Sequence, residues 1–245
     1  MKQNPLIIKP FGEEAVLIEW PTEVSEEILY DILAFMENFK TSFPNASQWE
    51  LIPAYNSLTI INSVEKFNFK KVKAEIEVCY LNRNLSINKG RYLWKLPVCY
   101  DLDFGIDLNE AAQILKLEIS ELIEKHTHQP YTVYGIGFLP GFMYLGGLPK
   151  DLEIKRRKKP RANVIKGSVG LAGVQTGIYP QDSPGGWNII GNCPVPIFNP
   201  EEEDPSFVRV GDKVSFYSIS RAEYNLHKIE AEVGIFKPDK IELNG

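Results

Sequence analysis

The stretch that decides the fold runs from Gly135 to Gly191 and reads GIGFLPGFMYLGGLPKDLEIKRRKKPRANVIKGSVGLAGVQTGIYPQDSPGGWNIIG. It holds twelve of the chain's 18 glycines, with five prolines, eight Lys or Arg residues and three carboxylates. Glycine permits positive φ and close backbone approach, so that N–H groups can converge on a ligand. The same glycines also suit the tight turns of a small barrel. Composition leaves both interpretations open.

The whole chain has 245 residues, which indicates one large domain or two modest ones. It is 44% hydrophobic and 24% charged, as is typical of soluble globular proteins. Its net charge of −5 gives no overall attraction to nucleic acid or to an anionic membrane. Residues 150–166 are the exception, with eight basic residues against two acidic ones. This basic segment suits an anionic ligand, an acidic partner or a solvated loop.

The cysteines Cys79, Cys99 and Cys193 are isolated and odd in number, and no CxxC occurs. This usage indicates a reducing compartment and argues against a disulfide framework. No run approaches the ~18 apolar residues of a membrane helix, and the first residues do not resemble a secretory leader. We therefore expect a cytoplasmic protein.

Residues 1–88 are expected to form a small α+β domain. The runs LIIKP and AVLIEW predict two strands, and apolar residues at helical spacing from Val24 predict a helix capped by Thr22 or Ser25. ELIPAY and SLTIIN predict two further strands, and residues 69–81 a second helix. An antiparallel sheet with both helices on one face would bury these patterns, as in ferredoxin-like folds.

Residues 89–245 are expected to form the second domain, because the segment NRNLSINKG is polar and turn-prone. RYLWKLPVCY predicts a strand, and two helices follow at LNEAAQILKL and ISELIEKHT, the first capped by Asp107 or Asn109. YTVYGIGF predicts a strand. Short apolar runs then alternate with turns: ANVIKG, VGLAG, TGIYP, WNIIG, VPIFNP and KVSFYSI, with one more strand after residue 222. This pattern is typical of an all-β barrel or sandwich.

Several common motifs are missing. The glycines 135, 137 and 141 are spaced one residue too widely for a dinucleotide fingerprint, and no Walker A loop occurs. His126 and His128 form an HxH pair without further ligands nearby, so that a structural role or proton transfer by His126 is favoured over a metal.

The sequence also lacks the usual motif of a serine hydrolase. Ser168 and Ser183 lie among glycines, but neither stands in a GxSxG elbow. Ser168, Gln175 and Thr176 offer polar groups beside exposed amides, which suits a carboxylate, an amide or a phosphate. In YPQDSPGGW a tight turn precedes Trp187, which either closes over a planar ligand or anchors the core.

The motifs GFLPGFMYLGGLP and KPRANVIKGSVGLAGVQTGIYPQDSPGGWNIIGNCP, with LPVCYD and HTHQPYTVYGIGF, resemble the family of 5-oxoprolinase B subunits. That family is also described as allophanate hydrolase subunit 1-like and as an inhibitor of a sporulation histidine kinase. The resemblance covers most of the chain. The sequence departs from it in DLDFGIDL after LPVCY, in Ile165 and Lys166 where Pro and Ala are usual, and in its final 20 or so residues.

The resemblance implies an N-terminal α+β domain and a C-terminal, mainly β, cyclophilin-like barrel. It implies two partners, a homologous barrel subunit (C-like) and a lactam-hydrolase subunit (A-like). The complex would use ATP to open 5-oxo-L-proline to L-glutamate, with no bound metal or biotin in this chain and no nucleic-acid or membrane partner. Alternatives are an inhibitor of a sensor histidine kinase and a subunit of an allophanate hydrolase or urea carboxylase-type enzyme. Alone, the chain is expected to be inactive.

The resemblance also implies three site segments: one loop from Phe138 to Gly147, the next from Arg156 to Ser168, and a third from Gln175 to Gly186. Arg161 would clamp a carboxylate or phosphate, amides near Gly167 and Gly185 would stabilise an oxyanion, and His126 would serve in acid–base chemistry. Arg161, Ser168 and His126 are thus the candidate catalytic residues. The candidate ligand-binding residues are Phe138, Pro140, Gly141, Tyr144, Gly146, Gly147, Arg156, Pro160, Gly167, Gln175, Thr176, Gly177, Ser183, Pro184, Gly185 and Gly186.

Overall fold

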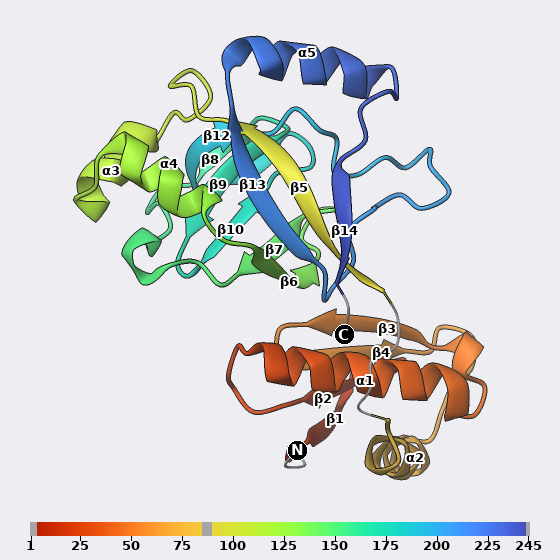
Figure 1. Ribbon diagram of the computed structural model, residues 1–245. Helices are drawn as coiled ribbons and strands as arrows, with labels where there is room; N and C mark the ends of the chain where they lie inside the picture. Colours follow the sequence, from red (N-terminus) through yellow and green to blue (C-terminus); the bar gives the residue numbers. More distant parts are fainter. Residues whose placement is uncertain (1–3, 85–89, 244–245) are drawn as a thin grey trace. The chain divides into compact units, whose positions relative to one another are not determined.

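The computed structural model describes residues 4–84 and 90–243. The chain divides into two compact units, Met1–Gly90 and Arg91–Asn244, and both are drawn in Figure 1. The boundary expected near residue 88 lies outside the described residues. Within the described residues, no helix combines the length and the apolar character that crossing a membrane requires.

The first unit is built on a four-stranded antiparallel sheet in the order β1-β2-β4-β3. Its strands are β1 (Ile7–Phe11), β2 (Ala15–Glu19), β3 (Glu50–Ala54) and β4 (Ser57–Ile61). The helices are α1 (Glu26–Ser42), the short 3₁₀ helix η1 (Ala46–Gln48) and α2 (Phe69–Leu81). The predicted order of strands and helices is confirmed. The unit begins with a hairpin rather than a βαβ crossover, and the ferredoxin-like assignment is not confirmed.

Both long helices pack on the same face of this sheet. Val16 and Ile18 of β2 join Leu58 and Ile60 of β4 in one core with residues from α1 and α2. Helix α1 begins as predicted, because the Ser25 hydroxyl accepts a hydrogen bond from the backbone N–H of Ile28 at 3.2 Å. The alternating and helical sequence patterns therefore position this core correctly.

The second unit is a closed barrel of seven strands in the order β6-β13-β5-β12-β9-β10-β7, with β7 returning to pair with β6. Strands β5 and β13 run parallel, and the other neighbours are antiparallel. The barrel strands are β5 (Arg91–Cys99), β6 (Tyr131–Ile136), β7 (Met143–Gly146), β9 (Ser168–Ala172), β10 (Gln175–Ile178), β12 (Asn188–Asn192) and β13 (Lys213–Ile219). The expectation of a barrel is confirmed, and the sandwich alternative is wrong.

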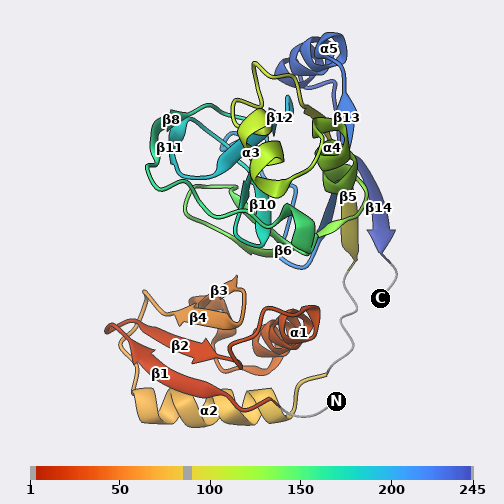
Figure 2. The same cartoon turned by 90° about the vertical axis from the view of Figure 1, so that its left-hand side faces the viewer.

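Apolar side chains fill the barrel. Leu96, Val133, Val169 and Val214 are fully buried in its core, which also includes residues of the helical pair. That pair consists of α3 (Leu108–Leu115) and α4 (Ile119–Thr127), which Figure 2 shows beside the barrel strands. The interior is therefore a packed core and not a ligand channel.

A two-stranded ribbon lies outside this closed ring, formed by β8 (Arg161–Val164) and β11 (Ser183–Gly185). The 3₁₀ helix η2 (Lys150–Leu152) precedes it in the chain. Next to the ribbon is a separate small core that includes Phe142, Val164, Tyr179 and Trp187. The glycine-rich stretch thus supplies both barrel strands and an outer layer.

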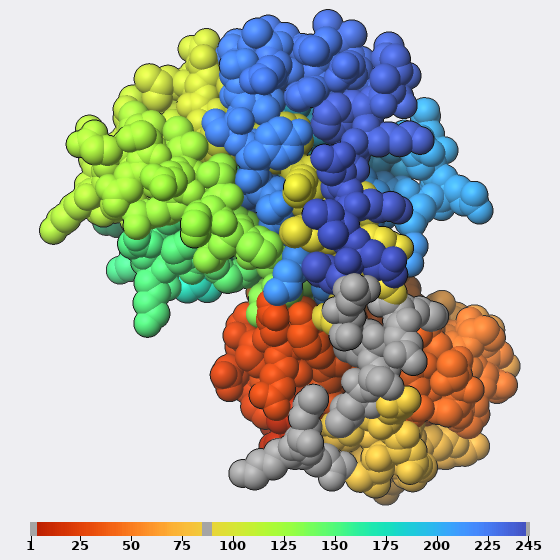
Figure 3. All heavy atoms as spheres, viewed as in Figure 1, coloured from red at the N-terminus to blue at the C-terminus, as the bar shows by residue number. Residues whose placement is uncertain are grey.

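The C-terminal part differs most from the sequence predictions. Helix α5 (Arg221–Glu232) was not predicted, whereas the final strand β14 (Asp239–Leu243) was, and it pairs with β5. The segment VPIFNP, expected to be a strand, contains none. Figures 1 and 3 show α5, in blue, lying on the surface of the barrel unit. A signal for α5 was present, because Ser220 and Glu223 form a capping box.

Replacing Gly105 by Ala is expected to destabilise the barrel unit by about 1–3 kcal/mol. An added Cβ would lie 2.5 Å from the backbone oxygen of Ile190, which cannot move without shifting β12. Gly137→Ala is the matched control, because nothing lies within 4 Å of its Cβ position. Urea unfolding of both variants measures the difference, and equal midpoints would contradict this account of the packing.

Candidate functional site

The buried carboxylate of Asp107, at the start of α3, is the anchor of the outer layer. Arg161 donates to it through both terminal nitrogens, at 2.9 and 2.5 Å, and Arg157 donates through Nη1 at 2.8 Å. The backbone N–H of Ile189 on β12 donates at 2.7 Å. The Asp107 side chain is only 3% exposed, whereas those of the two arginines are about a quarter exposed. One carboxylate thus joins α3, β12 and the basic segment.

This arrangement changes the roles that the sequence suggested. Asp107 occupies the cap position of α3, but its side chain makes no capping hydrogen bond there. The planar fork of Arg161 already holds a carboxylate, that of Asp107, and is therefore occupied within the chain. Arg157 is fixed further by its backbone N–H, which donates to the oxygen of Gly186 at 2.8 Å. These ion pairs and the backbone hydrogen bond fix the basic segment in place, so that it is not a freely solvated loop.

A cluster of aromatic side chains lies next to the basic segment, with Phe142 at its centre. Its ring makes edge contacts with those of Phe138, Tyr144, Tyr179 and Trp187, at centroid distances of 5.9, 5.0, 5.3 and 5.3 Å. Edge-to-face pairs of this kind are favoured by the ring quadrupoles. The cluster spans the 137–142 loop, β7, the residue after β10 and the turn before β12.

Two glycines allow this cluster to pack closely. A Cβ at Gly185 would lie 2.4 Å from the Tyr179 hydroxyl, and one at Gly177 would lie 3.2 Å from the Trp187 ring. Glycine is therefore required at 185 by close approach and not only by the turn.

Arg156 is the cation that this cluster leaves available. Its guanidinium carbon lies 5.7 Å from the centre of the Trp187 ring, and its side chain is exposed. Among the residues that the structure describes, it forms no ion pair. Burial raises the pKa of Tyr144 and Tyr179, and the charge of Arg156 opposes that rise. An exposed guanidinium beside aromatic rings suits a planar or apolar ligand that carries an anionic group.

The 137–142 loop brings several predicted residues to this place. Phe138 is 68% exposed and adopts a positive φ of 69°, which is uncommon for a bulky residue. Pro140 is exposed beside it, and Gly141 lies against the ring of Phe198, with φ of 79°. Of the residues predicted in this part of the chain, Tyr144 lies within the electrostatic reach of Arg156, and Phe138 contacts the cluster through the Phe142 ring.

Gly146 and Gly147 do not belong to that loop. Strand β7 separates them from Gly141, so that they lie at the opposite end of the strand. Gly146 accommodates the Tyr134 ring, and Gly147 accepts a hydrogen bond from the Gln129 amide. The expectation of a single loop from Phe138 to Gly147 is wrong, because Met143–Gly146 is a barrel strand.

His126 lies inside the core. Its Nδ1 contacts the Tyr100 hydroxyl at 2.6 Å, its Nε2 contacts the Thr176 hydroxyl at 2.8 Å, and its ring stacks on Phe216. The residue is fully buried, and this burial lowers its pKa to about 3. An enclosed, neutral imidazole argues against the acid–base role considered for His126 and assigns Thr176 to the same core network.

The remaining candidates are distributed over the outer layer and the barrel edge. Ser168 is buried at the start of β9, and Gly167 before it has a φ of 81°, where a Cβ would collide with the Cys193 oxygen. Gln175 is partly exposed on β10. Ser183, Pro184, Gly185 and Gly186 belong to the turn around β11, with Pro160 packed near Gly186.

The sequence missed three participants, namely Asp107 as an anchor, Phe142 and Tyr179. No local pattern marks Asp107, since the two arginines it binds lie 50 and 54 residues away in the sequence.

A metal site is not seen in the described part of the chain. No group of three or more His, Cys, Asp or Glu side chains that could hold an ion occurs within residues 4–84 and 90–243. The chemistry offered by this surface is therefore ion pairing and ring contact.

Comparison with known proteins agrees with this architecture. Residues 6–208 match the family described as "Carboxyltransferase domain, subdomain C and D". The chain is 36% identical over 237 residues to the 5-oxoprolinase B subunit of Bacillus subtilis, covering 91% of this chain and 97% of that protein. It also resembles the crystal structure of TTHA0988, with a TM-score of 0.72 and 31% identity over 84% of this chain.

The chain spans 40% of the length of TTHA0988. The Kluyveromyces lactis urea amidolyase structure shares the fold, with a TM-score of 0.80 at 18% identity, over 98% of this chain and 16% of that one. The chain is therefore a carboxyltransferase-type domain of subdomains C and D. Within that class it belongs to the family of 5-oxoprolinase B subunits, as the resemblance of its motifs implied.

Asp107→Ala is expected to destabilise the chain by about 3 kcal/mol, because it leaves two arginines and a buried N–H without their acceptor. Glu110→Ala is the matched control. It removes only the exposed pair with Arg157, worth less than about 1 kcal/mol. Thermal unfolding measures both, and limited trypsin digestion should cut within residues 155–161 faster in Asp107→Ala alone. Equal cutting in the two variants would refute the anchoring role.

Stability should also fall in acid because of His126. Its folded pKa of about 3 lies below the ordinary value, so between pH 6.5 and 3 the unfolded chain binds the proton and the folded chain does not. The free energy of unfolding should then drop as pH falls through this window, by up to about 1.4 kcal/mol per pH unit from this group. Denaturant titrations from pH 7 to 4.5 should show a shallower fall in His126→Gln than in the wild type. His128→Gln, which alters an exposed histidine, should keep the wild-type slope, and parallel profiles for all three would contradict the assignment.

Proposed function

We propose that this chain is a subunit of a 5-oxoprolinase complex, which opens 5-oxo-L-proline to L-glutamate with the hydrolysis of ATP. In that reaction water adds across the ring amide, the C–N bond breaks, and ATP becomes ADP and phosphate. The name of the Bacillus subtilis relative, matched over 97% of its length, supports the assignment. ATP is required by the complex and is not assigned to this chain.

The observation that carries the proposal is the exposed guanidinium of Arg156 beside the rings of Trp187 and Tyr144. It combines an available cation with aromatic rings. Such a surface suits a small ring that bears a carboxylate. Arg156, rather than the paired Arg161, is the residue that we assign to the carboxylate.

Other subunits are needed in this proposal. Ser168 is buried, and His126 bonds to Tyr100 and Thr176 rather than to a serine, so that this surface lacks an activated nucleophile. A homologous, C-like barrel subunit and an A-like lactam-hydrolase subunit would complete the site. A cyclophilin-like fold of the barrel, a ferredoxin-like first unit and a cytoplasmic location belong to the same proposal. The likeness to urea amidolyase concerns the fold alone.

Omitting this chain from the reconstituted complex should abolish ATP-dependent formation of glutamate from 5-oxoproline. Arg156→Ala should lower the rate about 10-fold or more with unchanged thermal unfolding, because it removes a cation and no internal ion pair. Lys158→Ala, an exposed change in the same segment, is the matched control and should leave the rate unchanged. Glutamate release at full rate without this chain would exclude the proposal.

A further inference from the structure

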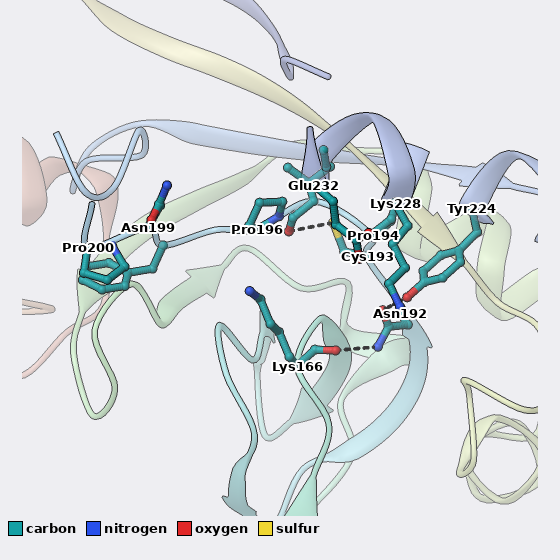
Figure 4. Close-up of a pocket in the computed structure, with 13 residues that line it drawn as sticks. Lys166, Asn192, Cys193, Pro194, Pro196, Asn199, Pro200, Tyr224, Lys228 and Glu232 are labelled. Carbon is teal, nitrogen blue, oxygen red and sulfur yellow. Dashed lines mark hydrogen bonds between the residues drawn. The ribbon is translucent and has the colours of Figure 1, made fainter. Parts of the chain in front are cut away.

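A pocket lies between α5 and the loop that follows β12. It encloses about 430 Å³ and is lined by residues of β12, of the 193–200 loop and of α5, with Lys166 on the opposite side. Figure 4 shows Lys228 and Glu232 reaching it from α5 and Lys166 entering from below. This volume lies in the range of small-molecule sites.

The walls of this pocket are fixed before any ligand arrives. Pro194, Pro196 and Pro200 line it, and proline locks its own φ. Phe198, a fourth lining residue, packs against Gly141, where an added Cβ would lie 2.5 Å from the Phe198 side chain. A rigid wall of this kind lowers the entropy cost of binding.

A buried asparagine, Asn192, lines the pocket with its side chain fixed by hydrogen bonds at both ends. The side chain of Asn192 is buried and accepts a hydrogen bond from the Tyr224 hydroxyl at 2.9 Å, and it donates one to the Lys166 backbone oxygen at 3.0 Å. Both ends of the amide are therefore oriented, as the dashed lines in Figure 4 show. Cys193 beside it is buried, which raises its pKa to about 12, so that it lines the pocket as a neutral thiol and not as a nucleophile.

The charged side chains that line the pocket indicate what kind of ligand it suits. Lys166 and Lys228 are both exposed, and within the described part of the chain neither ammonium forms an ion pair. Glu232 is the single carboxylate among the lining residues, which leaves one net positive charge in a chain of net charge −5. Two cations, one anion and proline-rich walls match a small acid with a compact apolar body and an N–H donor.

We propose that this pocket binds a small carboxylic acid that also carries an N–H group, with its carboxylate on Lys166 and Lys228, its N–H toward Glu232 and its apolar body against the prolines. Both 5-oxoproline and glutamate belong to this chemical class. Naming them rests on the proposed function, whereas the pocket itself does not. The family match ends at residue 208, so that α5 adds a wall from outside the matched segment.

Isothermal titration of the purified full chain tests the pocket without any enzymatic activity. The probes are 5-oxo-L-proline, L-glutamate, acetate and inorganic phosphate. Either of the first two should bind more tightly than acetate, and Lys166→Gln and Lys228→Gln should each weaken binding about 10-fold. Lys70→Gln, an exposed lysine of the first unit, is the matched control and should bind as the wild type does.

Three results would overturn the proposal: no binding of either acid, binding that both pocket lysine variants retain in full, or binding of phosphate alone. Binding of glutamate without 5-oxoproline would support the pocket and assign it to the product class. The two proposals can fail separately. A chain that binds the acid but is dispensable for the complex excludes the proposed function, whereas an essential chain whose lysine variants bind normally excludes the pocket.

Discussion

The ion pair between Asp107 and two arginines is the interaction on which the outer half of the barrel unit depends. A carboxylate this buried is costly unless it is paired and fully hydrogen-bonded. Here Arg157, Arg161 and the N–H of Ile189 supply those partners. Because the arginines come from the basic segment, satisfying one charge fixes the path of that segment over β12. The position of Arg156 beside Trp187 follows from this fixed path.

The dense glycines serve both purposes that composition left open. They form turns, and at several positions they also allow one layer to pack directly on another, as three examples show. Gly141 meets Phe198, Gly167 meets the Cys193 backbone, and Gly185 meets Tyr179. The first two contacts border the α5 pocket, and the third borders the aromatic cluster. The glycine-rich stretch is therefore a packing element shared by two candidate binding surfaces.

Local patterns predicted the strands and helices of the first unit and most of the barrel, because alternation and helical spacing report which face is buried. Local patterns did not predict the burial of side chains whose contacts come from residues far away in the sequence. His126 sits in a polar helix, yet Thr176, 50 residues away, encloses it. Strand β7 is glycine-bearing and only four residues long, which hid the separation of Gly146 from Gly141. Helix α5 exposes Leu226 and Ile229, so that its apolar spacing does not mark a buried face.

The parallel pairing of β5 with β13 has a consequence for how the protein is made. Strand β5 leaves the ribosome first, and its partner begins roughly 120 residues later, which at ~5–20 residues per second is a delay of roughly 6–24 s. The final strand, β14, pairs with the same strand and arrives later still. The sheet of the first unit, by contrast, is complete by Ile61. During synthesis, the first sheet can therefore form early, whereas the edge of β5 that pairs with β13 stays unpaired until the last part of the chain has been made.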